Sequence, residues 1–155
     1  MAITLDYLAN QPLSLPIVAN WYFEQWGHKV ANNSLEKTCA RLEGNMNRDR
    51  APLCIIALEN GVPQGAARLK LREMDIYPEK EFWLGSVYVP PAARGRAIAA
   101  QLSQRIAEIA HDFGARHLYL QTERLDGGPY GHQGWDPLEQ VRYQGLDVLV
   151  MGRML

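Results

Sequence analysis

The spacing of apolar residues is most regular between the two prolines at positions 90 and 91 and Gly114. Apolar side chains recur there every three or four residues, at Ile98, Leu102, Ile106, Ile109, Ala110 and Phe113. This period of 3.6 residues places them on one face of a helix, and glycine is the residue that typically ends one. The segment therefore predicts an amphipathic helix that packs one face against a core.

Two further helices are predicted in the first third of the chain. Apolar and aromatic side chains on one arc predict a helix that ends near Gly27, and they are Leu15, Val18, Trp21, Tyr22 and Trp26. A second helix is expected from Ser34, whose hydroxyl is a typical N-cap, to Gly44.

Short apolar runs rich in β-branched and aromatic residues predict strands around these helices. The predicted strands cover residues 2–8, 53–58, 64–71, 82–89, 116–122, 138–143 and 148–154. The Asn60-Gly61 turn predicts an antiparallel hairpin, and the strand–helix–strand order from 82 to 122 predicts a right-handed parallel βαβ unit. Gly85, inside a strand, indicates a bulge or a close approach of another group to the backbone. The pattern predicts a mixed sheet flanked by helices.

Composition narrows the partners and the compartment. With 155 residues the chain has the usual length of one domain, so residues 1–155 are expected to form a single domain. A formal net charge of -1 gives no broad positive field, which disfavours nucleic acid and anionic membranes as partners. Cys39 and Cys54 form no paired motif, and no basic leader or membrane-length apolar run occurs. We therefore expect reduced thiols and a cytoplasmic protein.

The start of the long helix lacks a capping side chain. The stretch VYVPPAARGRAIAAQL has no Ser, Thr, Asp or Asn at the expected position. A helix N-terminus leaves four unpaired N–H groups and carries about half a positive charge, so an anion fits there. Gly95 allows a close turn, Arg94 and Arg96 add positive charge, and Val87 and Val89 offer strand-edge groups for an amide-bearing arm. The pattern favours an acyl-coenzyme A, although a water-capped helix start fits the same spacing.

Three motifs occur in order along the second part of the chain. The first motif is the strand "VYV" with the "RGRAIA" stretch after it, the second is "PYGHQGW", and the third is the closing "VLVMGRML". Together they resemble the GNAT superfamily of acyl-CoA-dependent N-acetyltransferases, whose signature (Gln/Arg)-x-x-Gly-x-(Gly/Ala) follows a Val-x-Val strand. Here Ala97 replaces the middle glycine of that signature. The resemblance covers residues 53 to 155, whereas the first 50 residues are similar only in the order of elements.

The resemblance implies a fold and a cosubstrate. The fold is of the α/β (α+β) class, with a mixed, mostly antiparallel central sheet of six to seven strands, a central βαβ unit and flanking helices. Val87 and Val89 would bond the pantetheine arm of acetyl-CoA. The pyrophosphate would be held by backbone N–H groups of Arg94, Gly95, Arg96, Ala97, Ile98 and Ala99. No metal is implied.

The resemblance also implies catalytic residues. Tyr130 corresponds to the family tyrosine whose hydroxyl points at the sulfur, so it is expected to protonate the departing thiolate, and His132 is the weaker candidate for that proton. Some members place a glutamate six residues before the second valine, where this chain has Trp83. Glu81 has the parity to share a strand face with Trp83 and is therefore expected to act as a water-mediated base.

The implied reaction moves an acetyl group from acetyl-CoA to a primary amine by direct attack in a ternary complex. The acceptor is a small molecule, a peptide N-terminus or a lysine, and the acids Glu73, Asp75 and Glu81 favour a cationic one. A non-catalytic acyl-CoA-binding or regulatory module is the alternative, since Ala97 and Trp83 depart from the family pattern. The closing strands are candidates for pairing across a homodimer. No phosphate-binding GxxxxGK[ST] loop or GxSxG serine elbow occurs, which disfavours nucleotide enzymes and serine hydrolases.

Overall fold

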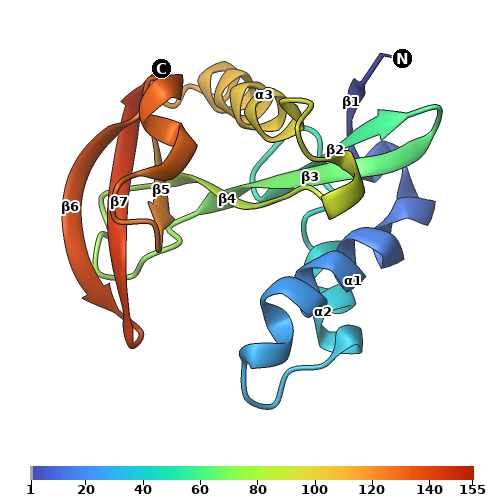
Figure 1. The fold of residues 1–155 in the computed structure, drawn as a ribbon, viewed down its shortest axis with the longest axis horizontal. Coiled ribbons are helices and arrows are strands. Elements are labelled where there is room, and N and C mark those ends of the chain that lie inside the picture. The colour runs from blue at the N-terminus through green and yellow to red at the C-terminus, as the bar shows by residue number, and fades with distance from the viewer. Residues whose placement is uncertain (1) are drawn as a thin grey trace.

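The computed structural model describes residues 2–155, which form a seven-stranded sheet with helices on both faces (Figure 1). The strands lie in the order β1-β2-β3-β4-β5-β7-β6, and all neighbours are antiparallel except β4 and β5. The strands are β1 (Thr4–Tyr7), β2 (Leu53–Glu59), β3 (Val62–Leu71), β4 (Phe82–Tyr88), β5 (His117–Thr122), β6 (Asp136–Tyr143) and β7 (Leu146–Met154). The mixed, mostly antiparallel sheet of six to seven strands expected from the sequence is confirmed.

Three α-helices cover the sheet, and short 3-10 turns connect the elements. The helices are α1 (Leu15–Gln25), α2 (Leu35–Glu43) and α3 (Ile98–Asp112), and the turns are η1 (Leu8–Asn10), η2 (Pro12–Ser14), η3 (Gly27–Lys29), η4 (Pro91–Ala93) and η5 (Gly128–Gln133). In Figure 1, α3 lies over one face of the sheet, and α1 and α2 lie over the other.

Strand β2 shows why helices must pack against both faces of the sheet. All of its residues except the last are buried, so its apolar run does not alternate with polar residues. Leu53, Ile55 and Ala57 point into the core beneath α3, whereas Cys54 and Ile56 point into the core beneath α1 and α2. A strand that is buried on both faces reads as continuous apolar sequence, because each face supplies its own layer of side chains.

At the two ends of the chain, the strand boundaries in the structure differ from those predicted from the sequence. The first strand covers Thr4–Tyr7 rather than residues 2–8, because the chain turns into η1 at Leu8. The last two strands each begin two residues earlier than predicted, at Asp136 and Leu146. The early start of β6 was missed because this strand lies at the sheet edge and its first five residues are exposed. Exposed residues do not give the apolar pattern from which a strand is predicted.

Strands β4 and β5 separate soon after they meet. Their parallel pairing has a single register pair, Trp83 with Tyr119. The helix α3 leaves the end of β4 and returns the chain to the start of β5, which is the predicted βαβ unit. The two strand ends therefore diverge in the middle of the sheet, and the candidate site is built around that divergence.

Both cysteines are free thiols, as expected, and Cys54 is buried beneath α1. The Cys54 thiol has its pKa raised to about 12, chiefly because burial penalises the thiolate. Across residues 2–155, no helix is long and apolar enough to cross a membrane.

Candidate functional site

The loop between β4 and α3 presents a helix start without a side-chain cap. Gly95 has φ 85°, and Ala97, the residue before the helix, has φ 58° and ψ 25°. Ala97 makes no side-chain hydrogen bond to the first turn, and its carbonyl oxygen accepts from the N–H of Gln101 at 3.0 Å. The first N–H groups of α3 therefore remain available to a ligand.

Ala97 occupies a conformation that glycine normally takes. The left-handed region brings Cβ close to the following carbonyl oxygen and costs an L-residue about 1–2 kcal/mol. Residues are held in such conformations where the surrounding structure requires that backbone path, and these positions cluster at functional sites. The replacement of the signature's middle glycine has thus left the turn of the loop in place.

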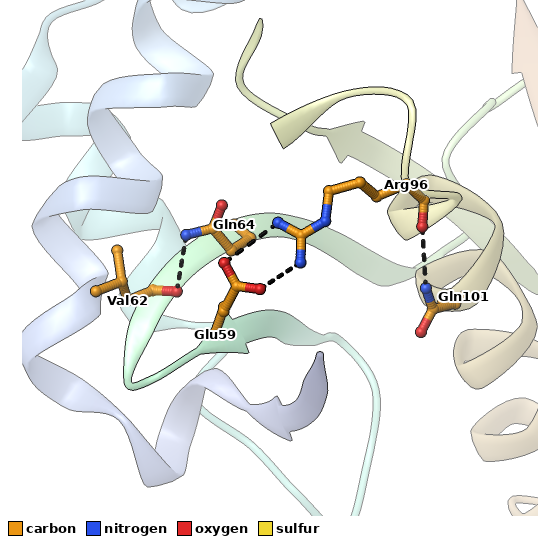
Figure 2. Close-up of polar contacts among 5 residues, drawn as sticks. All are labelled: Glu59, Val62, Gln64, Arg96 and Gln101. Atoms are coloured by element: carbon orange, nitrogen blue, oxygen red, sulfur yellow. Dashed lines mark hydrogen bonds and ion pairs between the residues drawn. The ribbon is translucent and has the colours of Figure 1, made fainter. Parts of the chain in front are cut away.

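The two arginines of the loop are both held by other parts of the protein. Arg94 folds back onto the residue that follows β4, where its Nε donates to the carbonyl oxygen of Val89 at 3.0 Å. Arg96 forms an ion pair with Glu59 at the end of β2, with a second contact between Nη1 and Oε1 at 3.3 Å (Figure 2). Gln101 donates from its side chain to the Arg96 carbonyl oxygen at 3.4 Å. The Glu59 carboxylate therefore offsets part of the positive charge that the sequence places beside the helix start.

Strand β4 carries a bulge just before this loop. Between the pairs Arg68–Gly85 and Ala66–Tyr88, β4 has one residue more than β3. The left-handed residue of the bulge is Ser86, with φ 51°, rather than Gly85. The extra residue reverses the alternation of the strand, so that Leu84 and then Val87 face the core beneath α3. A bulge leaves ladder groups unpaired, which makes the backbone here available for hydrogen bonds to a ligand.

A cavity of about 330 Å³ opens where β4 and β5 separate. Trp26 from the end of α1 lines it, together with Ser86 of the bulge and the ion pair Lys70–Glu73, in which Nζ and Oε1 are 2.7 Å apart. That ion pair lies across Gly85, where an added Cβ would be 2.8 Å from Lys70 Cδ and 3.0 Å from Glu73 Oε1. Of the two alternatives expected for Gly85, the close approach of another group to the backbone is confirmed, whereas the left-handed residue of the bulge is Ser86.

Tyr130 lies in η5, packed against the core beneath α3. Its ring meets Trp135 edge to face, with centroids 6.0 Å apart. Burial raises the pKa of the Tyr130 hydroxyl above its usual value, so the group is protonated at neutral pH. His132, in the same turn, is exposed.

A family model for the GNAT acetyltransferases matches residues 15–126. The chain belongs to the GNAT acetyltransferase family. No curated protein matched the chain.

The GNAT fold extends over nearly the whole chain. A putative acetyltransferase from Salmonella typhimurium, solved with its cofactor acetyl-CoA, has a TM-score of 0.78 at 18% identity, covering 99% of this chain and 94% of its own. A ribosomal-protein-alanine N-acetyltransferase from Brucella melitensis has a TM-score of 0.75 at 23% identity, covering 100% of both chains. An aminoglycoside 6'-N-acetyltransferase complexed with coenzyme A has a TM-score of 0.74 at 12% identity, covering 99% and 97%.

Trp83 shows what this GNAT chain has at the position where some members place a glutamate. Its side chain is fully buried, and its indole N–H donates to the Lys80 carbonyl oxygen at 2.7 Å. Its ring packs against Tyr119 at 5.6 Å between centroids. The position therefore serves packing, and the indole N–H is satisfied by the protein itself.

The structure does not bring Glu81 to the GNAT cavity. Glu81 precedes β4 and pairs with Arg72, with Oε2 and Nη2 2.7 Å apart. Glu81 lies five positions before Ser86, a distance of about 17 Å along an extended strand. Glu81 lies two residues before Trp83 and so has the spacing expected for the same strand face, but it lies at the opposite end of the strand from Ser86. Residue spacing predicts which face a side chain is on, not how far along the strand it lies.

Of the three acids named from the sequence, only Glu73 lines the cavity. Asp75 instead accepts a hydrogen bond from the Tyr143 hydroxyl at 3.1 Å. The sequence did not predict that Lys70 lines the cavity, because its pairing with Glu73 depends on how the chain turns after β3. Among residues 2–155, no group of three His, Cys, Asp or Glu side chains is arranged to hold a metal ion.

Proposed function

We propose that this GNAT domain transfers the acetyl group of acetyl-CoA to a primary amine by direct attack, without an acyl-enzyme. The amine belongs to a small molecule, a peptide N-terminus or a lysine. One observation carries the proposal: the uncapped start of α3 follows the bulge of β4 along the chain, and Ser86 of that bulge lines a cavity where β4 and β5 diverge. The anion site and the acceptor cavity thus flank one strand end, which brings two substrates together.

The residues of the β4–α3 loop fit an acyl-CoA. Free N–H groups at the helix start, from Arg94 to Ala99, would hold the pyrophosphate through hydrogen bonds and the helix dipole. Val87 and Val89 would bond the pantetheine arm through backbone groups released by the bulge at Ser86. When bound, acetyl-CoA supplies the thioester that the amine attacks.

Proton transfers are assigned to two side chains. Tyr130 would donate its hydroxyl proton to the leaving thiolate, and its raised pKa keeps that proton in place at neutral pH. Glu73 would accept one proton from the acceptor ammonium, directly or through water, because its carboxylate lines the cavity. The second proton that the nitrogen loses would pass to solvent as the amide forms, and solvent would return a proton to Tyr130. We assign this role to Glu73 rather than Glu81 because Glu81 is paired with Arg72 outside the cavity. Backbone N–H groups at the bulge would polarise the thioester carbonyl.

The test is a panel of amines and short peptides with acetyl-CoA, monitored by release of free thiol, beside calorimetry with coenzyme A. Amine-dependent thiol release supports the transferase. Affinity for coenzyme A without any amine-dependent release would instead support the binding module, which the buried Trp83 favours. Absence of affinity for coenzyme A would contradict both. The thiol reagent must be added after quenching, since Cys39 is only half-buried.

A further inference from the structure

A second hollow adjoins the cavity on the α1–α2 side. Its volume is about 300 Å³, and it shares Trp26 and Ser86 with the cavity already described. The two hollows are therefore adjacent, and together they are called the acceptor region. Trp26 stands between them, 38% exposed, with its ring 6.3 Å from Tyr88 and 5.8 Å from Tyr22 between centroids.

The two hollows carry different charges. The first is lined by Glu73 and Glu123 together with Lys70, whose charge is offset by Glu73 at 2.7 Å. The second is lined by Arg41 and Arg68, and among the described residues 2–155 no acidic side chain lines it. An acceptor that occupies both hollows thus meets a negative environment at one end and a positive one at the other.

Arg68 is the inner cation of the second hollow. It lies on β3 opposite Gly85 and, two residues before Lys70, shares the strand face that looks toward the acceptor region. The side chain is half-buried, and its Nε donates to the Asn45 amide oxygen at 3.1 Å. Asn45 is 3% exposed and is itself fixed, because its Nδ2 donates to the Arg41 carbonyl oxygen at 3.1 Å. A neutral amide therefore positions the guanidinium of Arg68.

Neither arginine of the second hollow has a carboxylate partner within residues 2–155. Arg41 lies at the exposed rim and donates to the Asn33 amide oxygen. Withdrawing a cation from water without a counter-ion is unfavourable, and a guanidinium binds a carboxylate through two parallel hydrogen bonds. Arg68 is therefore prepared for an anion that the protein does not itself provide.

We propose that Arg68, assisted by Arg41, binds a carboxylate on the acceptor, so that the acceptor is an amino acid or another amine with a free carboxylate. This assignment rests on the proposed acetyl transfer. The amine end lies at Glu73, the carboxylate end lies at Arg68, and the apolar middle packs against Trp26. A diamine is a poor acceptor, because its second ammonium would face Arg68. The acceptor is thus zwitterionic rather than simply cationic.

The experiment uses amines that differ only at the far end: δ-aminovalerate, its carboxamide, pentylamine and cadaverine, with ω-amino acids of other lengths and an aminoalkyl phosphonate. We expect kcat/KM for the best ω-amino acid to exceed that of its carboxamide by roughly tenfold, through KM. Arg68→Gln should reduce this ratio to near one and leave the carboxamide unchanged, whereas Arg68→Lys should retain part of it. Arg72→Gln, which removes an exposed cation outside both hollows, should keep the full ratio.

Three results would overturn the carboxylate assignment: equal turnover of carboxylate and carboxamide, a preference for cadaverine, or a preference for the phosphonate. An equal loss for every amine in Arg68→Gln would overturn it too, if melting temperature and coenzyme A affinity are unchanged.

If no amine is acetylated, the proposed reaction fails, and the anion subsite is tested by binding alone. N-acetyl-δ-aminovalerate should then raise the melting temperature of the coenzyme A complex in the wild type but not in Arg68→Gln. The neutral amide of the same compound should raise neither. A shift that is the same in both proteins would overturn the subsite.

Discussion

Glu59, at the end of β2, forms an ion pair with Arg96 in the loop that leads into α3 (Figure 2). The two residues are far apart in the chain, and the pair connects the β2–β3 hairpin to the proposed pyrophosphate site. Arg96 lowers the pKa of Glu59, chiefly through their hydrogen bond, so the carboxylate stays ionised at neutral pH. The pair is lost only as pH falls through that lowered pKa, and above it Glu59 competes with any phosphate for the Arg96 guanidinium.

Replacement of this carboxylate should strengthen coenzyme A binding. Glu59→Gln removes a negative charge beside the loop and releases Arg96 to face the phosphates. Because the pair is exposed, we expect a modest gain of about two- to fivefold in affinity at low salt, shrinking as salt screens the charges. Calorimetry at two ionic strengths measures it.

The matched control for Glu59→Gln is Glu108→Gln, which breaks an exposed pair with Arg105 further along α3 and should leave the affinity unchanged. A loss of affinity in Glu59→Gln would show that the pair instead holds the loop in its binding shape.

Ala97 stores conformational strain that glycine would relieve. The left-handed backbone costs alanine about 1–2 kcal/mol, whereas glycine raises the entropy of the unfolded chain by about 0.4–1 kcal/mol. We therefore expect Ala97→Gly to stabilise the protein by about 0.5–1 kcal/mol in urea unfolding. Ala100→Gly, inside the first turn of α3, should lose up to about 1 kcal/mol. Destabilisation by Ala97→Gly would mean that the Cβ of Ala97 makes contacts worth more than the strain.

Most of the fold follows from local sequence. The Asn60-Gly61 turn places both residues in the left-handed region, with φ 53° and 78°, and joins β2 to β3 as predicted. The apolar period of α3 and the glycine after it marked that helix from start to end. These elements were predictable because their residues contact one another within a few positions along the chain.

The charged contacts of the site were not predictable in the same way. Arg68 could not be predicted as a site residue, because its neighbours along the chain do not show that Asn45 positions it in a hollow. Within residues 2–155, no acidic side chain lines that hollow. Glu81 had the predicted parity, yet Arg72 pairs with it outside the cavity. Such contacts depend on how separate segments meet in space, which periodicity does not specify.

Tyr130→Phe tests the proton donor. Removal of a well-placed general acid should lower kcat by about 10²-fold, while coenzyme A affinity stays unchanged. Burial raises the pKa of the Tyr130 hydroxyl, so in the wild-type enzyme this hydroxyl should stay protonated through the mildly alkaline range. It should lose its proton only above the usual pKa of tyrosine. The pH profile of kcat checks this. Tyr143→Phe, which removes a hydroxyl bonded to Asp75, is the control and should change kcat little. An unchanged kcat in Tyr130→Phe would assign the proton to another donor, such as water.

The last prediction separates the two carboxylates proposed as proton acceptors. Glu73 lines the cavity beside Gly85, whereas Glu81 pairs with Arg72 before β4. Neutralising each in turn therefore removes a similar charge from inside and outside the site. We expect Glu73→Gln to lower kcat/KM for the amine by about 10- to 100-fold with coenzyme A affinity unchanged, and Glu81→Gln to stay within about twofold of the wild type.

The loss in Glu73→Gln has a second physical source, because it leaves Lys70 without its partner at 2.7 Å. A free ammonium in the cavity would repel the protonated amine and raise KM, while loss of the proton acceptor lowers kcat. The double variant Glu73→Gln with Lys70→Met removes that repulsion, so recovery of KM without recovery of kcat would identify Glu73 as the proton acceptor. If Glu81→Gln shows the larger loss of kcat, the acceptor amine must approach the opposite end of β4, and the cavity beside Gly85 is not where the reaction takes place.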